Sequence, residues 1–569
     1  MYYPSPKKAA RPLYKFPGGL HLPDNKRQST GQPTVKAELP KKLVVPLRQH
    51  IGAPAQPLVK VGDRVLKGQL IANPQGKISA AVHAPSSGIV SEIAEHPVAH
   101  PSGLSAFCIV IETDGKDEWC ELPPAIENFA ACDPALLLER IRNSGIVGLG
   151  GASFPSDVKL EPGNNRRIDT LVINAAECEP FITCDDMLMR ERPREILAGA
   201  AIMQHLVGAA LCLIGIEDNK PEAIAALNAA IAAQAIENVE VVTIPTRYPS
   251  GGERQLIRVL TGKEVPSGEI PARIGIVCHN VGTALAVADA VLRGRPLISR
   301  YVTLTGEGVV NPRNLETLIG TSCSELIGQA GGYTGKAQRL IMGGPMMGFT
   351  LHSDNVPVVK ASNCLLAASA REAPDPGAAS ACIRCGKCAE VCPVSLLPQQ
   401  MYWYARAKDL EKTQEYNLFD CIECGCCSHV CPSHIPLVQY YRFAKNESWD
   451  LEREKKSAEL ARQRHEAKLA RIARLEAEKK ERAQKKRAAL ARSSAAKRGV
   501  GTEADPKKAA IEAALKRAAE KKAQLASAGI KPQNTEHLSD AQQRQIRAAD
   551  ARRVSPAETP TGEAPEQER

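Results

Sequence analysis

Two copies of one cysteine pattern lie between residues 382 and 431. They read Cys382-Ile-Arg-Cys385-Gly-Lys-Cys388-Ala-Glu-Val-Cys392-Pro393 and Cys421-Ile-Glu-Cys424-Gly-Cys-Cys427-Ser-His-Val-Cys431-Pro432. Thiolate sulfur is the soft ligand that iron–sulfur clusters select. The spacing C-x2-C-x2-C-x3-C-P, present twice, therefore predicts a domain with two [4Fe–4S] clusters. The alternative is a pair of tetrahedral zinc sites, which seldom place three cysteines at equal spacing before a Cys-Pro pair.

The spacing resembles that of bacterial two-cluster ferredoxins, in which the fourth cysteine of each run binds the other cluster. The resemblance implies one cluster on Cys382, Cys385, Cys388 and Cys431, and a second on Cys421, Cys424, Cys427 and Cys392. Cys426 breaks no spacing and is interpreted as a spectator. Residues 397–416 are predicted to form a helix between the two halves, as in helical ferredoxin domains. The aromatic residues after each run are interpreted as core packing.

The composition indicates a multidomain protein in a reducing compartment. The chain has 569 residues, 43% hydrophobic residues, 18 cysteines and a net charge of +10. Cysteines outside the two runs, such as Cys108 and Cys278, lie in apolar contexts that are typical of reduced, buried thiols. The sequence starts without the apolar segment of a signal peptide. Residues 196–216 are apolar, but they change from a helical to a strand-like pattern, so no transmembrane segment is predicted.

The first 129 residues predict a small all-β domain, because short apolar pairs alternate with turn signals. The phrases Val61-Gly-Asp-Arg-Val-Leu-Lys-Gly-Gln69 and Ala84-Pro-Ser-Ser-Gly-Ile-Val90 resemble the barrel-sandwich hybrid of lipoyl and biotinyl carriers. Those carriers display a modified lysine within Met-Lys-Met. Lys77 lacks this setting, so the domain is interpreted as a docking domain.

Residues 130–295 alternate helix-like and strand-like segments, as an α/β domain does. Strands are predicted at 171–176, 211–216 and 239–244. The loop Gly148-Leu-Gly-Gly-Ala-Ser-Phe-Pro-Ser-Asp-Val-Lys159 has clustered glycines that let backbone N–H groups approach a phosphate. An ordinary glycine-rich turn is the alternative. Three further phrases favour a binding loop: Asn174-Ala-Ala-Glu-Cys-Glu-Pro180, Tyr248-Pro-Ser-Gly-Gly-Glu253 and Asn280-Val-Gly-Thr283.

Together these loops resemble the flavin-carrying, NADH-oxidising subunit of respiratory complex I. With the cysteine runs and the N-terminal β domain, residues 15 to about 445 more closely resemble the RnfC/RsxC family of the Rnf/Rsx electron-transport complex. The resemblance implies that FMN is bound by Gly148, Gly150, Gly151, Lys159, Asn174, Glu177, Asn280 and Thr283. It also implies that NADH meets Phe154, Glu179 and Glu253. Leu149, Ser153 and Gly252 depart from the complex I pattern, which affects the expected NADH contacts more than the flavin contacts.

Two segments follow the α/β domain. Residues 301–348 resemble the β-grasp domain of the soluble-ligand-binding type, and no ligand is assigned to it. Beyond residue 450 the chain is rich in Ala, Lys, Arg and Glu, which predicts a solvated helix or a disordered tail. Residues 555–569 are predicted to be disordered. The basic runs would also suit anionic lipid or nucleic acid, but a solvated helix is the preferred interpretation.

The sequence thus predicts a multidomain α/β protein with five parts. They are a barrel-sandwich-like domain (1–129), an FMN- and NADH-binding α/β domain (130–295), a β-grasp domain (296–360), a ferredoxin domain (361–448) and a charged tail (449–569). The family resemblance implies an oxidoreductase subunit that passes electrons between NADH, FMN and two [4Fe–4S] clusters, coupled in its complex to ion translocation. Integral membrane subunits and an iron–sulfur subunit are the expected partners, on the cytoplasmic side of the bacterial inner membrane. Nucleic acid is not expected to bind. The alternative function is a non-enzymatic iron–sulfur adapter with vestigial flavin loops.

Overall fold

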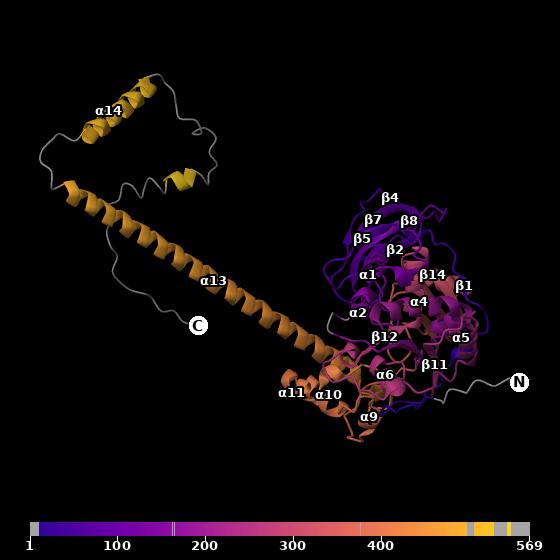
Figure 1. The fold of residues 1–569 in the computed structure, drawn as a ribbon. Coiled ribbons are helices and arrows are strands. Elements are labelled where there is room, and N and C mark those ends of the chain that lie inside the picture. The colour runs from indigo at the N-terminus through magenta and orange to yellow at the C-terminus, as the bar shows by residue number, and fades with distance from the viewer. Residues whose placement is uncertain are drawn as a thin grey trace. The chain divides into compact units, whose positions relative to one another are not determined.

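The computed structural model of the chain describes residues 11–161, 163, 166–375, 377–497, 506–527 and 543–547. The chain divides into two compact units, Met1–Lys456 and Ser457–Arg569. All the sheets that the structure describes belong to the first unit (Figure 1).

The N-terminal domain is all-β, as the turn-rich sequence predicts. One antiparallel sheet has the order β2-β8-β7-β4 and the other has the order β3-β5-β6. The strands are β2 (Lys42–Pro46), β3 (Gln56–Pro57), β4 (Arg64–Val65), β5 (Leu70–Asn73), β6 (Val82–His83), β7 (Gly88–Pro97) and β8 (Ser105–Thr113). Leu43 and Ile109 of the first sheet share a buried core with Ile71 of the second. Two sheets with one shared core form a sandwich.

The α/β domain is built on a parallel sheet with the order β11-β10-β9-β12. Its strands are β9 (Thr170–Ala175), β10 (Leu211–Glu217), β11 (Val239–Ile244) and β12 (Ile276–Asn280). Its helices are α1 (Pro134–Asn143), α2 (Ser156–Leu160), α3 (Cys184–Glu191), α4 (Pro193–Val207), α5 (Pro221–Ala233), α6 (Glu253–Thr261) and α7 (Val281–Arg293). The three predicted strands agree with β9, β10 and β11 to within one residue at each end.

Helices cover both faces of this sheet, because successive side chains of a strand point to opposite faces. Leu171 and Ile173 of β9 are buried in the core that contains α1, α4 and α7, whereas Val172 is buried in the core that contains α6. The chain enters the sheet at β9, builds outward to β11 and returns to the other side of β9 as β12. Ligands of such sheets bind beyond the carboxyl ends of the strands where the order reverses. Here that point lies between β9 and β12, where Asn174 pairs in register with Asn280.

A six-stranded mixed sheet follows, with the order β1-β14-β13-β17-β15-β16. Its strands are β1 (Val35–Lys36), β13 (Ser299–Thr305), β14 (Arg313–Leu318), β15 (Arg339–Met342), β16 (Phe349–Thr350) and β17 (Cys364–Ala368), and helix α8 (Cys323–Gln329) packs against it. The sheet extends past both ends of the expected 296–360 segment. β17 lies next to β13 in the sheet, and β1 comes from the N-terminal segment.

The cysteine-rich domain is helical. Its helices are α9 (Lys387–Glu390), α10 (Pro398–Arg406), α11 (Leu410–Glu415), α12 (Cys426–His429) and the first turns of α13 (Leu437–Lys497). The single helix expected over 397–416 is two helices. The chain breaks at Lys408, which has a positive φ of 57°, and Asp409 then caps α11 by accepting a hydrogen bond from the Lys412 N–H.

The second unit contains the rest of α13 and helix α14 (Pro506–Ser527). Between residues 457 and 495 every side chain is exposed and the chain is helical. Of the two predicted alternatives, a solvated helix and a disordered tail, this part is the solvated helix. The disorder predicted for 555–569 concerns residues outside the described part. Within the described residues, no helix has the length and apolar character that a membrane span needs.

Candidate flavin and cluster sites

The glycine-rich loop closes on itself at the switch point of the parallel sheet. Val147 and Pro155 form an isolated bridge, and the Gly148 N–H donates to the Phe154 carbonyl at 2.8 Å. Gly151 has a φ of +121°, which L side chains rarely adopt, and open space faces it. A Cβ on Gly150 would lie 3.3 Å from the Asn280 Cβ. The loop is therefore a backbone cradle against the end of β12.

The predicted polar residues at the strand ends gather around this loop. Thr283 Oγ1 accepts a hydrogen bond from the Leu149 N–H at 2.9 Å. Asn280 Oδ1 caps α7 by accepting from the Gly282 N–H at 2.8 Å. On the neighbouring strand, Asn174 Nδ2 donates to the Gly251 carbonyl at 2.8 Å, in the loop that leads into α6.

Lys159 and Glu253 form an ion pair beside the loop. The Lys159 Nζ and the Glu253 Oε1 are 2.8 Å apart, and the two side chains are 30% and 38% exposed. The pair joins α2 to the first turn of α6. Both residues therefore stand at the carboxyl edge of the sheet, within reach of solvent.

Three buried polar atoms near the loop have no hydrogen-bond partner among the described residues. They are Ser153 Oγ, Ser156 Oγ and His279 Nε2. Burial and the nearby Lys159 charge lower the pKa of His279, so its imidazole is neutral. Buried polar groups normally have partners. These atoms, together with the open face of Gly151, fit a bound polar group such as FMN. Sequence reasoning missed Ser156 and His279, although His279 directly precedes the selected Asn280.

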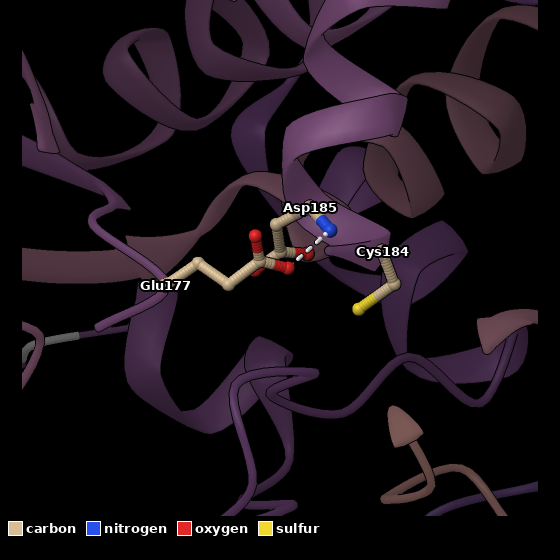
Figure 2. Close-up of side chains that lie close together, drawn as sticks. All are labelled: Glu177, Cys184 and Asp185. Carbon is tan, nitrogen blue, oxygen red and sulfur yellow. Dashed lines mark hydrogen bonds between the residues drawn. The ribbon is translucent and has the colours of Figure 1, made fainter. Parts of the chain in front are cut away.

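Glu177 lies in the loop after β9, and its side chain points to Asp185 at the start of α3 (Figure 2). Its Oε1 accepts a hydrogen bond from the Asp185 N–H at 2.7 Å, and its Oε2 accepts from the Asp186 N–H at 3.3 Å. Burial raises the pKa of Glu177 to about 8, against the opposing charge of Lys26. The Glu177 carboxyl group anchors its own loop to α3 through these two hydrogen bonds.

Glu177, Cys184 and Asp185 offer ligand atoms within 4.8 Å of one another. Asn280 Nδ2 donates to Asp185 Oδ2 at 2.6 Å, and both Glu177 oxygens accept from backbone N–H groups of α3. The Lys26 Nζ also lies 3.8 Å from Glu177 Oε2. The Glu177 and Asp185 side chains are therefore already used in contacts within the protein, and we assign no metal to the three residues.

Lys26 is the main site residue that the sequence did not reveal. It is buried, and its Nζ donates to the carbonyls of Glu177, Glu179 and Ile182 at 2.8, 3.1 and 2.5 Å. It comes from the irregular N-terminal segment, 151 residues before Glu177. No motif surrounds it.

Glu179 does not join Lys159 and Glu253. Its Oε1 accepts hydrogen bonds from the Met346 N–H at 2.7 Å and the Met347 N–H at 3.1 Å, in the turn after β15. Burial raises its pKa. For Phe154 the structure gives only the backbone contact with Gly148.

One set of four cysteines is mostly buried, with Cys421 as its half-buried member. Cys426 lines the same small cavity as the four motif cysteines Cys392, Cys421, Cys424 and Cys427. Lys445 Nζ donates to the Cys421 carbonyl at 2.7 Å and holds this run. We call these four residues the inner set. The fourth cysteine of the first run thus lies with the first three of the second run.

The other four cysteines lie toward the surface, and we call them the outer set: Cys382, Cys385, Cys388 and Cys431. Cys385 is exposed, and Ile383 beside it is 68% exposed. The Ser380 N–H donates to the Ser433 carbonyl at 2.9 Å, and Ser433 Oγ donates to the Ala381 carbonyl at 2.9 Å. These bonds bring the start of the first run next to Cys431.

Tyr248 connects the flavin-type loops to the inner set. Its hydroxyl donates to the Cys424 carbonyl at 2.7 Å, and its side chain is buried. Tyr248 shares a small core with Cys424 and Cys426, against which Cys178 and Met346 pack. Cys426 is therefore buried at the contact between the two domains. Burial raises the Tyr248 pKa, which keeps the hydroxyl protonated as a donor.

A separate cavity of about 530 Å³ lies where α3 and α7 meet β13 and the N-terminal domain. None of the predicted flavin or NADH residues is among its lining residues in the described chain. It borders the glycine-loop site from the other side, because Leu149 of the loop, Gly282 and Asp185 are among its lining residues.

Comparisons with known families agree with this organisation. Family models match at residues 14–116 (RnfC barrel sandwich hybrid domain), 141–289 (Nuo51 FMN-binding domain), 301–350 (SLBB domain) and 378–435 (4Fe-4S dicluster domain). These matches support FMN and [4Fe–4S] clusters as the cofactors.

Curated relatives are similar to this chain over most of its length. The RnfC subunit of the ion-translocating oxidoreductase complex from Pseudomonas aeruginosa is 55% identical over 72% of this chain and 52% of its own length. The corresponding proteins of Vibrio cholerae and Serratia proteamaculans are 50% and 45% identical, over 90% and 98% of this chain and 65% and 77% of their own lengths. The chain thus spans about half to three quarters of the length of these relatives. It belongs to the RnfC family of ion-translocating oxidoreductase complex subunits.

Proposed function

We propose that this chain is the peripheral subunit through which electrons pass between NADH, FMN and two [4Fe–4S] clusters, in a complex that couples their transfer to ion translocation. The proposal rests on one observation. The loops that contain Cys178 and Tyr248, at the carboxyl edge of the parallel sheet, pack directly on Cys424 of the inner set. The Tyr248–Cys424 hydrogen bond at 2.7 Å joins the two. Bound FMN would supply the conversion between a two-electron hydride donor and one-electron carriers.

The proposed flavin site uses the cradle at the end of β9 and β12. Backbone N–H groups of the glycine loop and the Lys159 ammonium would receive the phosphate and ribityl oxygens. The full proposed set is Gly148, Gly150, Gly151, Lys159, Asn174, Asn280 and Thr283. Glu177 would position the flavin site without touching FMN, because its side chain holds the loop to α3 through the Asp185 N–H.

The proposed nucleotide contacts are Glu253 and Phe154, since both lie at or beside the exposed edge of the loop. Glu179 remains in the proposal with a different role. Its carboxylate accepts two backbone N–H groups of the Met346 turn, so it would position the domains that meet at Tyr248.

The proposed order of electron carriers follows from burial. The inner set packs on the flavin-type loops, whereas the outer set includes the exposed Cys385. Electrons from FMN would reach the inner cluster first, then the outer cluster, and then another subunit. Integral membrane subunits, an iron–sulfur subunit and a place on the cytoplasmic side of the inner membrane complete the proposal.

The test is anaerobic reconstitution of the full chain with iron, sulfide and FMN, followed by addition of NADH. Flavin bleaching together with cluster EPR signals is the expected result. Lys159→Gln should weaken FMN binding by about tenfold, because a charge-assisted contact is lost. Lys263→Gln, an exposed lysine of the same domain, should leave it unchanged. Clusters that respond only to dithionite, with no flavin retained, would instead identify an iron–sulfur adapter.

A further inference from the structure

Aromatic residues are concentrated in the cluster domain. Nine of the 22 aromatic residues of the chain lie between positions 402 and 449, including two of the three tryptophans. Tyr402 and Tyr441 are buried in the domain core. Trp403 and Phe443, in contrast, are 39% and 37% exposed. Core packing therefore explains only part of this concentration.

Phe443 lines a groove between α10 and α13, and the half-buried Tyr440 lines it as well. These helices lie side by side, since the Tyr402 and Tyr440 rings are 4.9 Å apart in an edge-to-face contact (Figure 1). The groove has a volume of about 560 Å³. Its lining residues are Ala405, Arg406, Lys408, Pro436, Gln439, Tyr440 and Phe443. We call it the α10–α13 groove.

Two cations at the groove have aromatic neighbours and no acidic partner. The Arg406 guanidinium lies 5.8 Å from the Trp403 ring centre, and the Lys408 Nζ lies 5.7 Å from the Phe443 ring centre. Neither forms an ion pair with any described residue.

Three other cations on the helices of the same domain do have acidic partners. Lys412 pairs with Glu415, and Lys445 and Arg442 pair with Glu423, at 2.7 to 2.8 Å. The α10–α13 groove therefore keeps two unneutralised positive charges beside an apolar surface.

We propose that the α10–α13 groove binds an acidic segment of another subunit of the complex. An apolar side chain of that segment would pack on Tyr440 and Phe443, and its carboxylates would pair with Arg406 and Lys408. Tyr and Arg are enriched among the few residues that carry most of the binding energy of protein interfaces, and the groove offers Tyr440 and Arg406. Opposite charge favours one partner over others. The relatives of this chain are named as subunits of a complex, so other subunits are available as partners. The inference does not depend on flavin binding.

The first experiment places a photoactivatable phenylalanine analogue at Gln439, which is exposed in the groove. The intact membrane complex is irradiated, and the crosslinked peptides are identified by mass spectrometry. We expect a crosslink to a peptide of a different subunit that contains Asp or Glu close to the attachment point. Crosslinks confined to a second copy of this chain, to lipid or to nothing at all would overturn the proposal.

The second experiment tests charge. The double variant Arg406→Glu/Lys408→Glu should lower that crosslink at least tenfold and release the subunit from the complex at lower salt. The control is Arg453→Glu/Lys456→Glu, which makes the same charge change at two exposed cations that have acidic partners, Asp450 and Glu452. The control should behave like the unmodified subunit.

Cluster EPR separates a binding defect from misfolding. A correctly folded Arg406→Glu/Lys408→Glu variant keeps both cluster signals, whereas a misfolded one loses them. If it loses them, the milder Arg406→Gln/Lys408→Gln variant replaces it, with the same expected direction. Crosslinking and salt resistance that match the control in a cluster-containing variant would overturn the role of the two cations.

Discussion

The two cysteine runs have the same spacing but different surroundings. The inner set is closed in by α10, α13 and the Tyr248 loop, and its Cys392, Cys424 and Cys427 are at most 8% exposed. The outer set has Cys385 at the surface beside the exposed Ile383. Spacing alone therefore indicates which ligands belong to a run. The packing around each run indicates which cluster faces the flavin and which faces a partner.

The largest effect is expected from a test of crossed ligation, in which the fourth cysteine of each run binds the cluster of the other run. Cys392→Ala should abolish the cluster of Cys421, Cys424 and Cys427 and leave the outer cluster, because Cys392 lies with those three residues. Cys431→Ala should have the reverse effect. EPR of the two variants after dithionite reduction measures each cluster. If each variant lost the cluster of its own run instead, the crossed ligation would be wrong.

A chemical test uses the difference in exposure. Brief exposure to air should destroy the outer cluster several-fold faster than the inner one, since oxidation of a cluster depends on solvent access. The decay of the two EPR signals, assigned with the two alanine variants, gives the rates. Equal decay would mean that burial does not distinguish the two clusters.

Much of this fold could be predicted because the relevant signals are local. The strands at 171–176, 211–216 and 239–244 have continuous apolar runs that buried parallel strands require. The cysteine spacing, the glycine loop and Asn280 were also visible in the sequence. In the structure the loop, Asn174, Asn280 and Thr283 all lie together.

Other features depend on contacts between distant residues. Lys26 reaches Glu177 across 151 residues, and nothing near Lys26 indicates its three carbonyl partners. β1 and β17 join the mixed sheet from outside the predicted segment, because a two-residue strand and a short alanine-rich strand have no distinctive period. Glu179 matches a nucleotide-binding motif, yet its carboxylate accepts from the Met346 turn.

Tyr248→Phe tests the contact between the flavin domain and the inner set. The change removes one hydrogen bond to the Cys424 carbonyl, worth about 1 kcal/mol. The reduction potential of the inner cluster should shift by a few tens of millivolts, while that of the outer cluster stays constant. Redox titration followed by EPR measures both. A shift of the outer cluster alone would contradict the assignment of Tyr248 to the inner set.

The smallest effect is expected from removal of the tail after Lys456. Both cysteine sets, Lys445 and the glycine loop lie in the first unit, whereas residues 457–495 are exposed. The truncated protein should therefore keep its iron, sulfide and flavin content within error, and both clusters should keep their EPR signals. Iron and flavin analysis of the full and truncated proteins, prepared in parallel, checks this. Loss of the outer cluster alone would mean that the tail protects the exposed side of the domain, and it would remove exposure as the basis of the difference between the two sets.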